Sequence, residues 1–144
     1  MLVLPRAELA KIHRHAVESL PEECCGFLLG RGGPAGVVTE ARAVENVHPG
    51  PREVRYTVDP LEVLRLDREL RGGGVEHLGF YHSHPGHPPE PSEFDLDRAW
   101  PGYAYLILSV HGGKPGDLRV WRVAAVGKPF EEEPVSVLES GDVV

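Results

Sequence analysis

Apolar side chains recur at two different periods along the chain, and each period predicts one kind of element. Spacings of three and four residues indicate a helix with one buried face, and they occur over about residues 5–19 and 59–71. The second stretch opens with Asp59 and Pro60, a cap followed by a residue suited to the first helical turn. The apolar positions of the two faces are Leu9, Ile12, Ala16 and Leu20, and Val63, Leu66 and Leu70.

Short apolar or alternating runs bounded by glycine and proline predict strands. Proline-containing segments over 45–53 and 85–91 are expected to be loops, and residues 92–99 a short third helix. The run from Glu131 to Glu133 is expected to be a solvated acidic turn. The predicted strands are 2–4, 24–29, 37–44, 55–58, 78–81, 103–110, 118–126 and 135–138. This order of elements predicts an α/β fold with a central mixed β-sheet flanked by helices.

Composition narrows the class of protein. A chain of 144 residues with 41% hydrophobic and 26% charged residues is typical of one globular domain, so we expect a single domain over residues 1–144. The net charge of −7 argues against nucleic acid as a partner, because phosphates need a basic surface. Without a membrane-length apolar run or a signal-peptide pattern, we expect a cytoplasmic protein with no membrane contact. Cys24 and Cys25 lack the spacing of a zinc motif and are expected to be buried.

The densest chemistry lies in the segment from His82 to Asp95. His82 and His84 are two residues apart at the end of a predicted strand, so both rings leave the same face of the sheet. Two imidazoles and one carboxylate form a donor set that Zn²⁺ accepts in catalytic sites, with a fourth position left for water. Asp95, in the first turn of the helix after the proline-rich loop, is best placed to supply the carboxylate. These three side chains therefore predict one zinc ion per chain.

A hydrolase that activates water at zinc also needs a base. Glu23 directly precedes the predicted strand 24–29, and we expect it at the zinc end of the sheet if that strand neighbours the His82 strand. There Glu23 would move a proton from the catalytic water to the departing amine. Ser92 fits a hydrogen-bond donor to the oxyanion that forms on the attacked carbonyl, and it also fits the cap of the short helix.

These residues carry a resemblance to a known family. The sequence has Glu23 followed by Cys25-Gly26, and then His-x-His, seven residues, Ser, two residues and Asp. This pattern is similar to that of the JAMM metalloproteases, also called MPN-plus or Mov34/PAD-1, and the resemblance covers most of the chain. It implies that family's cytidine-deaminase-like fold. The implied zinc ligands are His82, His84 and Asp95, the implied general acid/base is Glu23, and Ser92 would stabilise the tetrahedral intermediate.

The resemblance further implies a zinc (iso)peptidase of the compact prokaryotic type. Because the chain lacks long insertions for gripping ubiquitin chains, it resembles members associated with ubiquitin-like sulfur-carrier proteins that end in Gly-Gly. We therefore expect hydrolysis of an amide bond at the C-terminal Gly-Gly tail of such a carrier. Two alternatives stay open: a zinc hydrolase of small peptides or amino-acid amides, and a non-catalytic MPN scaffold. The absence of a PCxxC motif argues against a cytidine deaminase.

Other conspicuous residues receive structural interpretations. His87 is expected to face the loop or the substrate, because a fourth protein ligand would displace the water. His13 and His15 repeat the His-x-His pattern within a helix, where positions i and i+2 diverge, and both are expected at the surface. Trp100 suits either core packing or a peptide groove.

Overall fold

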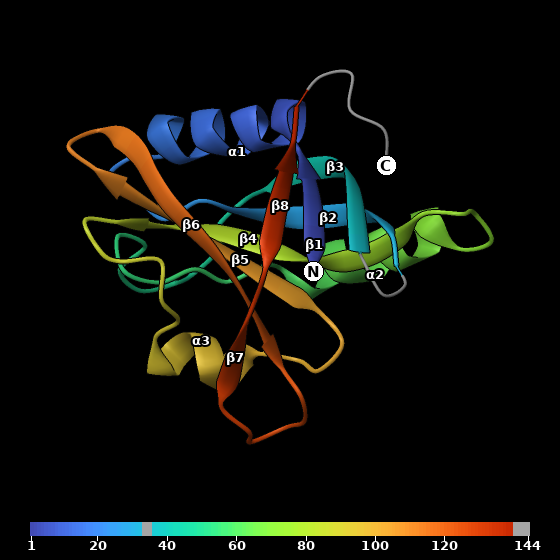
Figure 1. Ribbon diagram of the computed structural model, residues 1–144. Helices are drawn as coiled ribbons and strands as arrows, with labels where there is room; N and C mark the ends of the chain where they lie inside the picture. Colours follow the sequence, from blue (N-terminus) through green and yellow to red (C-terminus); the bar gives the residue numbers. More distant parts are fainter. Residues whose placement is uncertain (33–35, 140–144) are drawn as a thin grey trace.

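The computed structural model describes residues 1–32 and 36–139 of the chain, and it confirms an α/β fold with a mixed sheet. Among the described residues, no helix is long and apolar enough to cross a membrane. In chain order (Figure 1) the elements are β1 (Leu2–Pro5), α1 (Arg6–Glu18), β2 (Cys25–Arg31), β3 (Gly36–Val44), α2 (Pro60–Leu70), β4 (Glu76–Pro85), α3 (Glu93–Arg98), β5 (Ala104–His111), β6 (Lys114–Val123), β7 (Phe130–Glu133) and β8 (Val135–Leu138).

These strands form one sheet in the order β7-β6-β5-β4-β2-β3-β1-β8. β4 pairs with β5 in parallel, as β1 does with both β3 and β8, and the other neighbours are antiparallel. β7 and β8 lie at opposite ends of this order, yet only Pro134 separates them in sequence. The sheet is therefore curled until its two edges meet, and Figure 1 shows β7 and β8 as one continuous ribbon.

The two faces of the sheet carry separate cores. α1 covers one face, where Leu9 joins a large cluster of buried aliphatic side chains. α2 covers the other face, where Leu66 packs among aromatic rings. Successive residues of β4 alternate between these faces, so Tyr81 lies in the α1 core and Phe80 in the α2 core. By the same period His82 faces the α2 side of the sheet, together with the other candidate site residues.

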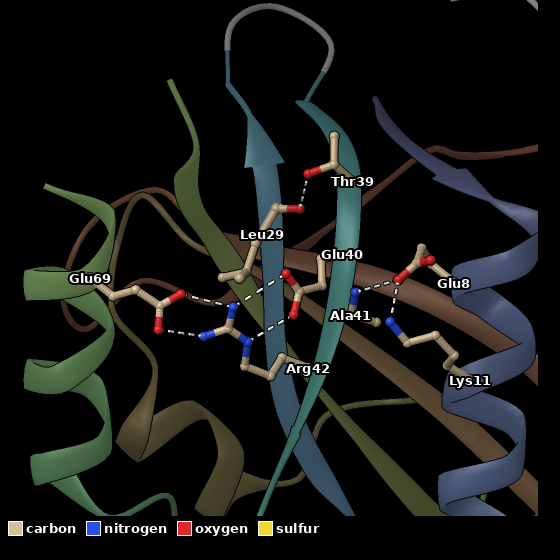
Figure 2. Close-up of polar contacts among 8 residues, drawn as sticks. All are labelled: Glu8, Lys11, Leu29, Thr39, Glu40, Ala41, Arg42 and Glu69. Atoms are coloured by element: carbon tan, nitrogen blue, oxygen red, sulfur yellow. Dashed lines mark hydrogen bonds and ion pairs between the residues drawn. The ribbon is translucent and has the colours of Figure 1, made fainter. Parts of the chain in front are cut away.

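Acidic side chains of both long helices fix them to β3 (Figure 2). Glu8 of α1 accepts a hydrogen bond from the backbone N–H of Ala41 at 2.8 Å, and this donor lies beyond the end of the β1–β3 pairing. On the other side of β3, Arg42 donates to Glu69 of α2 at 2.9 Å and to Glu40 at 2.8 Å. One strand thus holds the helices of both faces in register with the sheet.

Two segments differ from the prediction. Residues 55–58 form no strand, because the Asn46 side chain replaces strand pairing by donating to the Arg55 carbonyl at 3.0 Å and accepting from the Thr57 N–H at 3.1 Å. Residues 130–133 are not a turn but the edge strand β7, paired with β6. Charged side chains suit an edge strand because they discourage pairing with other chains. The predicted final strand is present as β8.

Candidate metal centre

β4 places two histidines side by side on the α2 face of the sheet. β2 is its neighbour, and Cys25 lies opposite His82, so the condition set for Glu23 is met. His82 and His84 are 1% and 6% exposed, and their Nε2 atoms are 3.1 Å apart. The strand period of two is what directs both rings to the same place.

α3 brings a carboxylate to these two rings. Ser92 caps the helix: its Oγ accepts from the Asp95 N–H at 3.1 Å, and its own N–H donates to Asp95 Oδ2 at 2.9 Å. This reciprocal capping box fixes the Asp95 side chain at the start of the helix. The same Oδ2 atom lies 3.4 Å from Nε2 of His82 and 3.5 Å from Nε2 of His84.

The three atoms form a triangle that fits a zinc ion. Its sides are 3.1, 3.4 and 3.5 Å. Donors about 2.0–2.1 Å from a tetrahedral zinc ion lie about 3.3–3.4 Å from one another, so the triangle matches within a few tenths of an ångström. Two imidazole nitrogens and one carboxylate oxygen are also a donor set of catalytic zinc sites, which keep their fourth position open.

Glu23 approaches the same histidines from the start of β2. It is 4% exposed, and its backbone N–H donates to the Arg52 carbonyl at 2.7 Å. A ligand atom of Glu23 and one of each histidine lie within 4.8 Å of one another, a looser group than the triangle with Asp95. The distances therefore group Asp95 more tightly than Glu23 with the two histidine nitrogens, and Glu23 lies beside this group.

Burial governs the proton affinities of this site. It raises the pKa of Glu23 to about 8; His84 opposes the rise and Asp95 adds to it. Burial also lowers the pKa of His82 in spite of the nearby Asp95, which keeps that ring in the neutral form that binds metal. For Asp95, burial is outweighed by the interactions with His82 and His84 and by the hydrogen bond from the Ser92 backbone N–H, which hold its pKa well below the usual range.

His84 is oriented by the proline-rich loop. Its Nδ1 lies 2.8 Å from the Pro88 carbonyl, and a proton donated there leaves the Nε2 lone pair directed at the centre. Burial lowers the pKa of His84, but its interactions with Asp95, Pro88 and Glu23 outweigh this effect, so the pKa is raised overall. Gly86 supplies the turn of this loop with a φ of 73°, a left-handed conformation that favours glycine.

Two supporting residues were not foreseen from the sequence. Asn46 also donates to the Glu23 carbonyl at 3.0 Å, so the side chain that organises residues 55–57 also fixes the backbone of Glu23. The Tyr56 ring stacks on His82 with centroids 4.3 Å apart. The only signal for Asn46 is that it is the single asparagine of the chain, and nothing in the pattern around Tyr56 pointed to the site.

The remaining expectations had mixed outcomes. Cys24 and Cys25 are buried, as predicted, and His87 lies exposed in the loop. The prediction that His13 and His15 lie at the surface was wrong: both are half-buried, and Nδ1 of His15 lies 2.7 Å from the Tyr81 hydroxyl. Trp100 is 64% exposed, so it does not pack in the core.

With the geometry in hand, comparison with known proteins gives the family. The model for prokaryotic homologs of the JAB domain matches residues 5–124, and the chain belongs to this family. Over 93 residues, which are 64% of this chain and 66% of the relative, it is 46% identical to a desampylase from Haloferax volcanii. Over 112 residues it is 33% identical to a probable TtuB-protein conjugate cleaving protease from Thermus thermophilus, covering 78% of this chain and 72% of that protein.

Solved structures share the fold of this chain. The solution structure of a Desulfitobacterium hafniense protein has a TM-score of 0.82 at 30% identity, covering 97% of this chain and 94% of that one. A JAB1/MPN domain protein from Archaeoglobus fulgidus, with a TM-score of 0.59 at 20% identity over 96% of this chain and 97% of that one, shares the fold. Family membership, with relatives named a desampylase and a probable conjugate cleaving protease, makes the protein a JAMM-type hydrolase, as predicted.

Proposed function

We propose that the protein is a zinc-dependent (iso)peptidase that hydrolyses an amide bond at the C-terminal Gly-Gly tail of a ubiquitin-like carrier protein. The observation that carries this proposal is the triangle of His82, His84 and Asp95 with the buried Glu23 beside it. The names of the relatives, a desampylase and a TtuB-protein conjugate cleaving protease, support the class of substrate.

His82, His84 and Asp95 would hold one zinc ion per chain. When bound, zinc supplies a Lewis acid that lowers the pKa of water and polarises a carbonyl group. Two of the three side chains are held in advance, His84 by the Pro88 carbonyl and Asp95 by the capping box with Ser92. Such outer contacts keep ligands oriented and reduce the reorganisation needed on binding.

Glu23 moves the protons in this proposal. It takes one from the attacking water and passes it to the departing amine, two steps that need a group able to hold and release a proton near neutral pH. Burial gives Glu23 that property by raising its pKa to about 8. A carboxylate with an ordinary pKa would be a poor acid for the second step.

Ser92 has two roles in the proposal. Its Oγ accepts the hydrogen bond of the helix cap, and the hydroxyl proton stays available for donation. Ser92 is exposed, and its backbone N–H donates a hydrogen bond to the Asp95 carboxylate. Its hydroxyl would donate to the oxyanion of the tetrahedral intermediate.

The decisive assay uses a carrier whose terminal glycine is joined through an amide bond to a second protein. We expect the zinc-loaded protein to release both partners and a chelator to stop the reaction, with activity returning on addition of zinc. A short peptide containing the same Gly-Gly amide is compared in parallel. Equal rates on both substrates would favour the small-amide hydrolase, and zinc binding without cleavage of either would contradict the proposal.

A cytoplasmic location and the action of residues 1–144 as a single catalytic domain are part of the same proposal. Purification of the intact chain and of residues 1–139 would check the second point. Loss of folding or cleavage in the shorter chain would support residues 1–144 as the domain, and equal cleavage rates by both would place the C-terminal domain boundary before residue 140.

A further inference from the structure

A cavity of about 630 Å³ opens beside the metal centre and shares walls with it. Asp95 lines the cavity, and so does Tyr56, whose ring stacks on His82. The lining is mainly aromatic and aliphatic, with rings from Tyr56, Phe80, Phe94, Tyr103 and Tyr105. An extended chain rises about 3.3 Å per residue, so the cavity lies within reach of the residues next to a bond held at His82, His84 and Asp95.

The mouth of the cavity carries apolar side chains that are open to solvent. Leu64 of α2 and Trp100, just beyond α3, both line it and are 55% and 64% exposed. Leu61, one turn before Leu64, is 56% exposed. Exposed apolar groups around a hollow mark a surface that binds a partner.

Two arginines lie against the ring of Phe94, which lines the cavity, and one of them, Arg98, lines the cavity itself. The guanidinium carbon of Arg55 is 4.8 Å from the ring centroid and that of Arg98 is 4.5 Å from it. The two carbons are therefore no more than 9.3 Å apart. Contact with an aromatic face holds a guanidinium in place while its N–H donors stay free.

Neither arginine has an acidic partner within the part of the chain that the structure describes. Arg42, Arg119 and Arg122 each pair with glutamates, whereas no ion pair or hydrogen bond from the side chain of Arg55 or Arg98 occurs among residues 1–32 and 36–139. The molecule as a whole has 22 acidic and 15 basic residues, so two arginines that lack an ion-pair partner in the described part of the chain and lie beside one ring are cations left available to an anionic ligand.

We propose that Arg55 and Arg98 are specificity-determining residues that bind a carboxylate of the substrate tail, next to an apolar side chain seated in the cavity. The planar guanidinium group can donate two parallel hydrogen bonds to a carboxylate, so this pair favours acidic over basic tails. The inference rests on the proposed function, because it takes the tail of a ubiquitin-like carrier as the ligand. It adds that the enzyme selects carriers with Asp or Glu shortly before Gly-Gly.

Binding of tail peptides tests this without catalysis. Two fluorescent peptides ending in Gly-Gly are compared by anisotropy, identical except that the residues just before Gly-Gly include two glutamates in one and two lysines in the other. We expect the wild-type protein to bind the acidic peptide about tenfold more tightly at low salt, the effect of two screened surface contacts. At about 0.5 M salt the preference should shrink, since screening weakens exposed charge pairs.

Charge reversal supplies the matched control. Arg98→Glu should abolish or invert the preference, and the Arg55→Glu/Arg98→Glu double variant should invert it. Arg65→Glu changes the charge equally on exposed α2, where Arg65 pairs with Glu62, and should keep the wild-type preference. Because each variant is judged by its own ratio between the two peptides, a general loss of folded protein does not imitate the effect. An equal preference in wild type, or a ratio that Arg98→Glu leaves unchanged, would overturn the inference.

Cleavage of two carrier conjugates with the same tails separates this inference from the proposed function. Equal kcat/KM for acidic and basic tails would overturn the selection of acidic carriers while leaving the peptidase in place. Cleavage of neither conjugate, together with the expected peptide preference, would overturn the peptidase and leave the carboxylate-binding pair. A higher kcat/KM for the acidic tail that Arg98→Glu removes would support both.

Discussion

The chain contains the pattern His-x-His twice, once in β4 and once in α1, and the two regions use it differently. In β4, successive side chains alternate, so His82 and His84 bring their Nε2 atoms within 3.1 Å. In α1, positions two apart differ by about 200° around the helix axis, so His13 and His15 point in different directions. The period of the backbone, rather than the residue pattern, therefore decides whether two histidines can approach the same metal ion.

The surroundings of the two pairs differ as much as their geometry. His82 and His84 face the carboxylates of Asp95 and Glu23, whereas His15 faces the phenol of Tyr81 across the α1 core. Tyr81 is the residue just before His82, so one strand supports the metal centre on one face and a structural hydrogen bond on the other. Two buried carboxylates beside the first pair favour a cation there, whereas the partner of His15 at hydrogen-bond distance is a phenol.

The largest difference between the pairs should appear on truncation. We expect His82→Ala to lose stoichiometric zinc and to reduce cleavage by more than about 100-fold, because a ligand and its orientation are both removed. His13→Ala should keep zinc and stay within about twofold of wild-type activity, as a substitution away from the centre. Metal analysis and kcat/KM of the two purified variants check this, and zinc loss in His13→Ala would break the comparison.

Sequence reasoning could predict that the proposed ligands lie together because short periods are local. The strand period placed His82 and His84 together, and the cap pattern placed Asp95 in a first helical turn. The position of Glu23 needed one non-local fact, that β2 is the neighbour of β4. Asn46 could not be foreseen, because it acts by binding backbone groups that only the folded chain brings together.

Glu23 gives the second prediction, which concerns chemistry and pH together. Glu23→Gln should lower kcat by about 10²- to 10⁴-fold, the usual contribution of an acid/base, while zinc is retained. Without zinc, the raised pKa of Glu23 makes its contribution to stability complete below the unfolded pKa of about 4.3 and lost as pH rises through about 8. Urea unfolding of the zinc-free protein should therefore show falling stability over that window, less so in Glu23→Gln.

A flat pH dependence in the zinc-free wild type, or an equally steep one in Glu23→Gln, would show that Glu23 is not held protonated by burial. Because Glu23→Gln is predicted to keep zinc, its activity loss is distinguished from that of His82→Ala by metal content alone.

The smallest effect is expected on the other face of β4. Tyr81→Phe removes the hydrogen bond with His15 at 2.7 Å and should reduce the free energy of unfolding by about 1 kcal/mol. Zinc content and kcat/KM should stay close to wild type, because the ring still fills the α1 core. Urea unfolding and zinc analysis measure both quantities, and a loss of zinc would show that the two faces of the strand are coupled.

The edge strand β7 shows where pattern reasoning fails for the fold. Three glutamates in a row have the composition of a solvated turn, but the backbone of residues 130–133 pairs with β6, and only Pro134 separates it from β8. Closure of the curled sheet, a property of all its strands together, imposes the extended conformation there. Local composition does not contain that constraint.

The central claim is that Asp95, and not Glu23, completes the metal centre with His82 and His84. We would measure the zinc content of Asp95→Asn and Glu23→Gln, each purified and loaded with zinc in the same way as the wild-type protein. The geometry predicts close to one zinc per chain in Glu23→Gln and a large loss in Asp95→Asn. Retention of zinc by Asp95→Asn together with its loss from Glu23→Gln would contradict the claim and make Glu23 the third ligand.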